Sequence, residues 1–401
     1  MNYEKVVQGI LNIGEAMLQC GAEIFRVEDS LYRMYKSYGF VKYDVYVIPS
    51  NIQVTVETPE GEIITQIRHI ESSEPNFDQL DYLNNLCRYV CQHTPDENEM
   101  REKYLEVINR EPQKRITRYA AGIMGGTGFA VFFGCNLRDA VIAFIVSVMI
   151  VAVGDWLAKR ESNLLVYNGI LAFISEVIII GALKMGIAEH PDRIMIGIVM
   201  LLISGLSTTN GIRDLLQRDF ISGFINIMNS FLGAAGIAFG IGLAIILFHE
   251  GYSDHFILNH SVPIQLLSCT VACTGFALWF KIRGKQVWYN SIGAFFTWAI
   301  YVAVYAVKPS NFLATMIAAG FVGFYAFIMS RVNKAPSTIF LTASVFPLIP
   351  GPNLYYVMYG CVSQDPKMVF NETIILLATC LAIAFGFIIV DVASRSIMHA
   401  M

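Results

Sequence analysis

From Tyr119 onward the chain is a succession of apolar stretches, each about 20 residues long, separated by short polar segments. A stretch of this length crosses the hydrocarbon core of a bilayer when it forms a helix. Charged residues make up 15% of the 401 residues, against about 25% in a typical soluble domain. They are concentrated in residues 1–118. The sequence therefore predicts a polytopic α-helical membrane protein that carries a soluble N-terminal domain.

The N-terminal domain, residues 1–118, combines helix and strand patterns. In AEIFRVEDSLYRMYKSYG (22–39), apolar residues recur at the spacing of one helix face. The segment VKYDVYVIPSNIQVTVETPEGEIITQIRHI (41–70) alternates apolar and polar residues between two turn signals, which predicts three strands in a meander. Helices are also expected over 77–92 and 95–109, the second with Thr94 as the N-cap of a capping box. We expect an α+β fold for this domain.

The orientation in the membrane follows from the charges. Glu4 and Glu15 interrupt the first 18 residues, so these do not resemble a signal peptide, and the N-terminal domain is expected in the cytosol. Ten basic residues then fall in cytoplasmic loops and five in outer loops, as the positive-inside rule predicts. Both termini are expected to be cytoplasmic. The ten expected spans are roughly 119–135, 139–158, 164–184, 193–211, 219–248, 262–280, 287–306, 311–330, 336–360 and 370–394.

Two short matches indicate an internal repeat. TGFAVFF (127–133) returns as TGFALWF (274–280), each in the first span of a half, and SGLSTTN (204–210) corresponds in position to PLIPGPN (347–353). Five spans per half is an odd number, so the second half must enter the membrane upside down, as in many secondary transporters. We expect one five-helix repeat over 119–250 and a second over 251–401.

The fourth and ninth spans contain residues that interrupt a membrane helix. Paired interruptions in two inverted halves are a sequence pointer to a substrate site, and a free helix N-terminus suits a carboxylate. The alternative is that small residues only allow close helix packing. We expect a small carboxylate-bearing solute to bind between these two spans. The predicted binding residues are Ser207, Thr208, Thr209, Asn210, Pro350, Gly351 and Asn353.

Three further charged residues stand out near these spans. Glu176 lies in the middle of the third span, where it either carries a proton that is coupled to transport or is a buried structural carboxylate. Arg213 and Asp214 follow the fourth-span interruption. They either gate the inner mouth as an ion pair or anchor the helix end.

The interrupted segments also carry a resemblance to a known family. GAEIFRVEDSL (21–31), SGLSTTNGIRDLLQRDFISG (204–223) and FPLIPGPNLYY (346–356) resemble the bacterial threonine/serine exporter family, in its fused form with both halves in one chain. The resemblance implies ten spans, a location in the bacterial cytoplasmic (inner) membrane and export of small amino acids. Two-chain members are linked to dicarboxylate export. Many members carry Pro-Gly where this chain has residues 207–209.

Other classes of function find little support in the sequence. No Walker A motif, nucleotide fingerprint or catalytic constellation is present, so we expect neither an enzyme nor a cofactor. The segment HEGYSDHFILNH (249–260) fits no standard metal site, and a net charge of −4 does not suggest a nucleic-acid partner. We predict a proton-coupled antiporter that exports threonine or serine. A dicarboxylate exporter and a membrane sensor with a cytosolic effector domain are the alternatives, and a homo-oligomer remains open.

Overall fold

A computed structural model describes residues 2–71, 73–203, 207, 211, 214–215, 219–248 and 261–400, with side chains up to residue 393. The expected loop 249–260 lies outside this range. The chain divides into two compact units. Unit 1 comprises Met1–Gln113 with the short segments Phe280–Arg283 and Met329–Ile339, and unit 2 comprises Lys114–Trp279, Gly284–Ile328 and Phe340–Met401.

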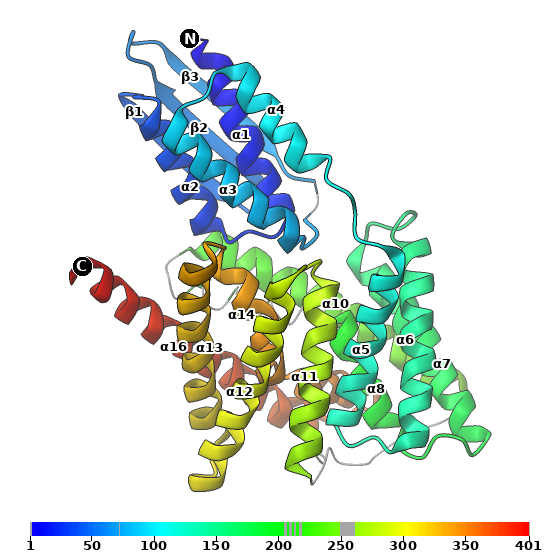
Figure 1. The fold of residues 1–401 in the computed structure, drawn as a ribbon. Coiled ribbons are helices and arrows are strands. Elements are labelled where there is room, and N and C mark those ends of the chain that lie inside the picture. The colour runs from blue at the N-terminus through cyan, green and yellow to red at the C-terminus, as the bar shows by residue number, and fades with distance from the viewer. Residues whose placement is uncertain are drawn as a thin grey trace. The chain divides into compact units, whose positions relative to one another are not determined.

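Unit 1 contains the predicted three-stranded meander. Strands β1 (Lys42–Ile48), β2 (Asn51–Glu57) and β3 (Ile63–His69) form an antiparallel sheet in the order β1-β2-β3 (Figure 1). The register pairs Val45 with Val54 on the neighbouring strand. Alternate residues of the strands are buried, so one face of the sheet packs against helices, as the period-two pattern predicts.

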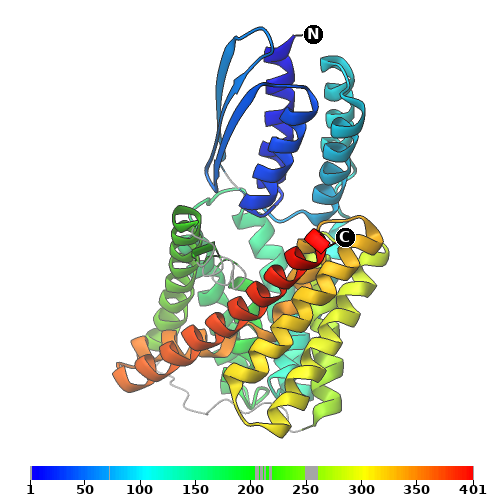
Figure 2. The same ribbon diagram turned by 90° about the vertical axis from the view of Figure 1, so that its left-hand side faces the viewer.

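Four helices complete the α+β fold of unit 1. Helices α1 (Tyr3–Gln19) and α2 (Ile24–Ser37) cover one face of the sheet, and α3 (Phe77–His93) and α4 (Glu97–Ile108) form a further layer on the other side of α1 and α2 (Figure 2). The helix pattern in residues 22–39 is confirmed. Its apolar positions are buried because they repeat at helical spacing on one face.

The predicted capping box at Thr94 is wrong. Thr94 ends α3 in the left-handed conformation, with φ of 42°, and its N–H donates to the carbonyl of Val90. The N-cap of α4 is Asp96, whose carboxylate accepts from the amides of Asn98 and Glu99. An Asp side chain caps a helix as well as Thr does, and the αL position of Thr94 leaves it unable to cap the next helix.

Unit 2 is built from helices. In chain order they are α5 (Arg115–Phe132), α6 (Leu137–Leu157), α7 (Leu164–Lys184), α8 (Pro191–Leu202), α10 (Phe220–Phe248), α11 (Val262–Trp279), α12 (Lys285–Val307), α13 (Asn311–Asn333), α14 (Ser337–Val345), the 3-10 turn η1 (Phe346–Leu348), α15 (Gly351–Val362) and α16 (Pro366–Ala400). The ends of α13 and α14 that adjoin residues 329–339 belong to unit 1.

Seven helices in the described part of the chain are long and apolar enough to cross a membrane: α6, α7, α10, α11, α12, α13 and α16. The protein is thus a polytopic helical membrane protein. The first, fourth and ninth expected spans are not among the seven. Helix α5 begins with Arg115 and Arg118, which lowers its hydropathy, and the other two spans are broken into shorter pieces.

The two segments of the expected repeat pack against each other. TGFAVFF lies on α5 and TGFALWF on α11, and the rings of Phe129 and Phe276, which correspond in the two segments, meet edge to face at 5.6 Å. A Cβ on Gly128 would lie 2.9 Å from the backbone nitrogen of Ala272, and one on Gly275 would lie 2.8 Å from the carbonyl oxygen of Ala121. The helices approach closely because both contact positions are glycine.

Glycine mediates a second type of close contact in unit 2. On α10, a Cβ at Gly236 would meet the backbone of Leu165 on α7. On α16, a Cβ at Gly386 would lie 2.6 Å from the carbonyl oxygen of Met316 on α13. Helices α7 and α10, and likewise α13 and α16, therefore pack closely at these positions.

All eight cysteines are free thiols. Cys20 and Cys87 in unit 1 are buried, and burial raises the pKa of each thiol to about 12. The part of the chain that the structure describes contains no cluster of three His, Cys, Asp or Glu residues suited to a metal ion. The buried thiols are thus packing residues in their present environment.

The α5–α11 contact generates a stability prediction. Gly275→Ala should destabilise the protein by about 1–3 kcal/mol, because the new methyl group has backbone rather than a flexible side chain in its way. Gly181→Ala on α7 is the control, since among described residues nothing lies within 4 Å of the added Cβ. There the helix propensity of alanine should leave stability unchanged or raised by up to about 1 kcal/mol. Thermal unfolding in detergent, followed with a thiol-reactive dye, measures both, and equal midpoints would contradict the close contact.

Candidate functional site

The ninth span is broken at its centre, as the prolines predict. Helix α14 ends at Val345, η1 follows, and Ile349 is extended with ψ of 127° before α15 begins. Pro347 and Pro350 lack the N–H that an unbroken helix needs. The break is confirmed, and it lies among buried residues, where the freed backbone groups need partners.

The N-terminus of α15 offers fewer backbone donors to a carboxylate than the sequence suggested. The Gly351 amide donates to the carbonyl of Ile349 at 2.8 Å, and the Leu354 amide donates to the carbonyl of Pro350 at 3.2 Å. Pro352 has no N–H. The backbone at this helix end therefore offers a carboxylate fewer donors than the general rule for helix N-termini implies.

The fourth span stops early. Helix α8 ends at Leu202 and Ile203 is extended with ψ of 130°. The buried Asn168 of α7 donates from Nδ2 to the carbonyl of Leu202 at 3.5 Å and to the carbonyl of Gly233 on α10 at 3.2 Å. A side chain thus supplies the partner that water supplies outside a membrane. Asn168 is not among the residues predicted from the sequence, although a lone Asn inside an apolar span indicates a buried hydrogen-bonding role.

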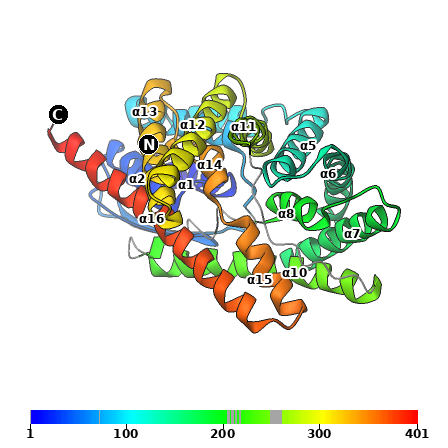
Figure 3. The ribbon, with the colours of Figure 1, turned by 90° about the horizontal axis from the view of Figure 1, so that it is seen from below.

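Helices α8 and α15 pack against each other. A Cβ at Gly351 would run into the side chain of Met200, so the ninth-span break lies against the last turns of α8. Figure 3 shows α8, α14 and α15 within unit 2. The adjacency of the fourth and ninth spans, which the site prediction required, is therefore present. Gly351 is buried in this helix contact.

A cavity of about 1020 Å³ lies against the ninth-span break. It is formed at the ends of α11, α12 and α13 that lie away from residues 280–283 and 329–339, and by α15 and the start of α16. Most lining side chains are apolar or aromatic, with a few polar groups, which is typical of a small-molecule site. The principal lining residues are Phe132, Gln265, Trp298, Tyr301, Asn311, Thr315, Pro347, Pro350, Pro352, Asn353, Tyr356, Asp365, Lys367, Asn371 and Glu372.

Only some of the predicted binding residues line the cavity in the part of the chain that the structure describes. Pro350 and Asn353 line the cavity. Ser207 is not among the lining residues that the structure describes, and Thr208, Thr209, Asn210 and Arg213 lie outside the described residues. Asp214 accepts a hydrogen bond from Nδ2 of Asn226 on α10 at 3.1 Å. This contact ties the segment after the fourth span to α10.

Sequence analysis missed two polar contacts of the cavity. Nδ2 of Asn353 donates to Oε2 of Glu372 at 2.8 Å, which links α15 to α16. The indole N–H of Trp298 donates to Oε1 of the buried Gln265 at 3.0 Å. The signal for Glu372 was an ionisable residue in the first turns of an apolar span. Its hydrogen bond with Asn353 depends on the packing of α15 against α16, which the sequence pattern does not specify.

Glu176 is buried in α7, with 1% of its surface exposed. Neither of its carboxylate oxygens makes a hydrogen bond to a described residue. Asp192 of α8 and the Tyr355 hydroxyl of α15 are close enough to interact with it electrostatically. The buried carboxylate therefore lies within electrostatic range of both helices that carry the breaks.

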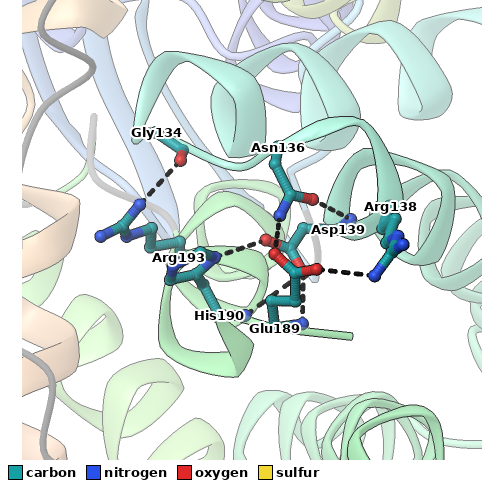
Figure 4. A network of polar contacts seen from close by, with 7 residues as sticks. All are labelled: Gly134, Asn136, Arg138, Asp139, Glu189, His190 and Arg193. Atoms are coloured by element: carbon teal, nitrogen blue, oxygen red, sulfur yellow. Dashed lines mark hydrogen bonds and ion pairs between the residues drawn. The ribbon is translucent and has the colours of Figure 1, made fainter. Parts of the chain in front are cut away.

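The end of α8 that lies away from the break is held by a polar network (Figure 4). The buried Asp139 carboxylate accepts from the backbone amides of Glu189 and His190 and is 2.9 Å from Nδ1 of His190. Arg138 pairs with Glu189 at 2.8 Å, and Arg193 donates to the carbonyl of Gly134. These contacts fix the start of α8 to the neighbouring loops.

Comparisons with known proteins agree with this architecture. A family model described as a putative threonine/serine exporter matches residues 8–248, and a second, described as threonine/serine exporter, ThrE, matches residues 265–393. The threonine/serine exporter of Corynebacterium glutamicum is 23% identical over 414 aligned positions, covering 97% of this chain and 83% of that protein. A probable threonine/serine exporter of Mycobacterium tuberculosis is 21% identical, covering 97% of this chain and 76% of that protein.

No solved structure matches the chain. The two family models together extend over both units of the fold, from α1 to α16. On this evidence the chain belongs to the threonine/serine exporter family.

Proposed function

We propose that the protein is a secondary transporter that exports threonine or serine across the bacterial cytoplasmic membrane in exchange for protons. The observation that carries the proposal is the cavity of about 1020 Å³ against the broken ninth span. Irregular backbone at membrane depth is tolerated where it lines a cavity, and transporters use such breaks to bind solutes. The names of the similar proteins support an amino acid as the solute.

The proposal includes ten spans arranged as two inverted repeats, 119–250 and 251–401, behind an N-terminal domain of residues 1–118. The contact between the repeated segments of α5 and α11 supports it, because a two-fold relation between the halves would bring corresponding residues such as Phe129 and Phe276 together. The similar glycine contacts in α7–α10 and α13–α16 support it as well.

The proposed orientation places the N-terminal domain and both termini in the cytoplasm. Residues 280–283 and 329–339 cluster with residues 1–113 in one compact unit. In that unit Lys281 pairs with Glu74 at 3.1 Å, and Arg283 lies 3.6 Å from Asp78. The basic loops that the positive-inside rule assigns to the cytoplasm therefore join the same unit as the soluble domain.

Glu176 is the proposed proton-coupling group. An ionised carboxylate without a partner is unfavourable inside a membrane protein, whereas a protonated one is tolerated. Its electrostatic interaction with Asp192 of α8 and Tyr355 of α15 relates the proposed proton site to the two broken spans. A change in its charge would thus alter the relative stability of two arrangements of these helices. The predicted residues in 207–213 complete the proposed site and gate.

The substrate assignment predicts a specific pattern of flux. Proteoliposomes preloaded with labelled threonine or serine should release it faster than protein-free vesicles, and an acidic exterior should accelerate the release because protons enter in exchange. Labelled succinate should stay inside, because its two carboxylates need two cationic partners. Lys367 is the single cation among the cavity-lining residues that the structure describes. Release of succinate alone would identify a dicarboxylate exporter. Release of none of the three would favour a sensor.

The coupling role predicts a separation of two activities. Glu176→Gln should leave threonine exchange across the membrane within about threefold of wild type, because glutamine resembles the protonated carboxylate in size. Acceleration by a pH gradient should be lost. Asp155→Asn is the control: Asp155 pairs with Arg118 at 2.9 Å where α5 begins and α6 ends, and the variant should still respond to the gradient. An unchanged gradient response in Glu176→Gln would exclude Glu176 as the coupling group.

A further inference from the structure

The cavity contains a carboxylate that is held in place by the ninth-span break. Glu372 lies in the second turn of α16, is half-buried and lines the cavity. Its Oε2 accepts from Nδ2 of Asn353, the third residue of α15, at 2.8 Å. The bond joins residues on two helices, so the position of the Glu372 charge depends on the conformation of the break.

Glu372 differs in its bonding from the other acidic residue of the cavity. The Asp365 carboxylate caps α16 and accepts from the backbone amides of Lys367 and Met368 at 3.0 and 3.1 Å. The hydrogen bond from Asn353 uses one lone pair of one oxygen of Glu372. An ionised carboxylate has about four acceptor positions, so Glu372 retains capacity for another donor group.

We propose that Glu372 binds the α-ammonium group of the transported solute and that Asn353 is the residue that positions it. An ammonium group offers three donors and a positive charge, and a charge-assisted hydrogen bond to a carboxylate is stronger than a neutral one. A solute with a second carboxylate in place of the ammonium meets repulsion from the same side chain. Glu372 therefore selects amino acids against dicarboxylates and against acids that lack an amino group. This inference rests on the proposed function and specifies the chemistry of its site.

The rest of the cavity suits the remainder of an amino acid. Lys367 supplies a cation near the start of α16 for the carboxylate. Trp298 and Tyr301 stack with their rings 4.6 Å apart and form an aromatic wall. The bond between Trp298 and Gln265 fixes the orientation of that wall. A small side chain bearing a hydroxyl group would lie between this wall and the polar groups of α15 and α16.

The test compares two competitors in reconstituted vesicles. Unlabelled threonine and 3-hydroxybutyrate, which lacks the amino group, are each titrated against exchange of labelled threonine. Wild type should prefer threonine by at least about tenfold. In Glu372→Gln, which keeps an oxygen to accept from Asn353, this preference should fall by about 10- to 100-fold. Asp365→Asn removes a charge from the same cavity but keeps a capping side chain, and its preference should equal that of wild type.

The outcomes separate this inference from the proposed function. If wild type transports threonine and Glu372→Gln keeps the full preference for threonine over 3-hydroxybutyrate, the inference is overturned and the exporter function stands. If wild type transports neither threonine nor serine, both this inference and the proposed exporter function are overturned. The comparison in wild type requires no folded variant: equal inhibition by threonine and 3-hydroxybutyrate would overturn the role of Glu372 by itself. A purely structural Glu372 would change the amount of active protein and leave the preference unchanged.

Discussion

The structure of unit 2 depends on the requirement that every backbone polar group in a membrane has a partner. Straight helices meet this requirement within themselves, and the broken spans meet it through specific contacts. The side chain of Asn168 donates to the carbonyl of Leu202, which has no partner within α8. The amide of Gly351 donates to the carbonyl of Ile349. The irregular segments are thus stable features of the fold. They expose backbone N–H and C=O groups at positions where a continuous helix would use these groups in its own hydrogen bonds.

The helix breaks, whose free backbone groups have hydrogen-bond partners, also explain how a mostly apolar protein holds charged groups in its interior. Glu372 lies in the cavity because Asn353 projects from the first turn of α15 and fixes it. Glu176 is buried in α7 and lies within electrostatic reach of Asp192 on α8 and Tyr355 on α15. In the proposed mechanism solute and proton therefore both act on α15. Coupling then follows from a shared structural element rather than from direct contact between solute and proton.

Much of the fold could be predicted from the sequence because its periodicities are strong. The meander of unit 1, the long apolar helices and the proline break of the ninth span follow from local pattern alone. The end of α8 at Leu202 lay a few residues before the expected interruption, and Thr94 caps a different helix end. Boundaries of this kind depend on which of several neighbouring side chains captures a backbone group. The sequence pattern alone does not show which of these side chains will form the hydrogen bond.

The site could be predicted only in part for a related reason. The prolines predict a break in the ninth span, and the structure places Pro350 and Asn353 in the lining of the cavity beside it. Glu372 and Asn168 acquire their roles from residues far away in the chain, Asn353 and the pair Leu202 and Gly233. Such pairings depend on how helices pack, which a single sequence does not specify. Gly351 lies where α15 approaches Met200 of α8, and its predicted role in solute binding stays a prediction.

In the proposed transporter the solute binds in the cavity beside the ninth-span break. Asn371 is exposed and lines this cavity, so Asn371→Cys in a Cys361→Ser background places a reactive thiol there. The measurement is the rate at which a membrane-impermeant thiol reagent modifies this cysteine, with and without saturating threonine. If the solute binds in the cavity, threonine should slow the modification and succinate should not. An equal rate with threonine present would contradict it and would place the solute elsewhere in the protein.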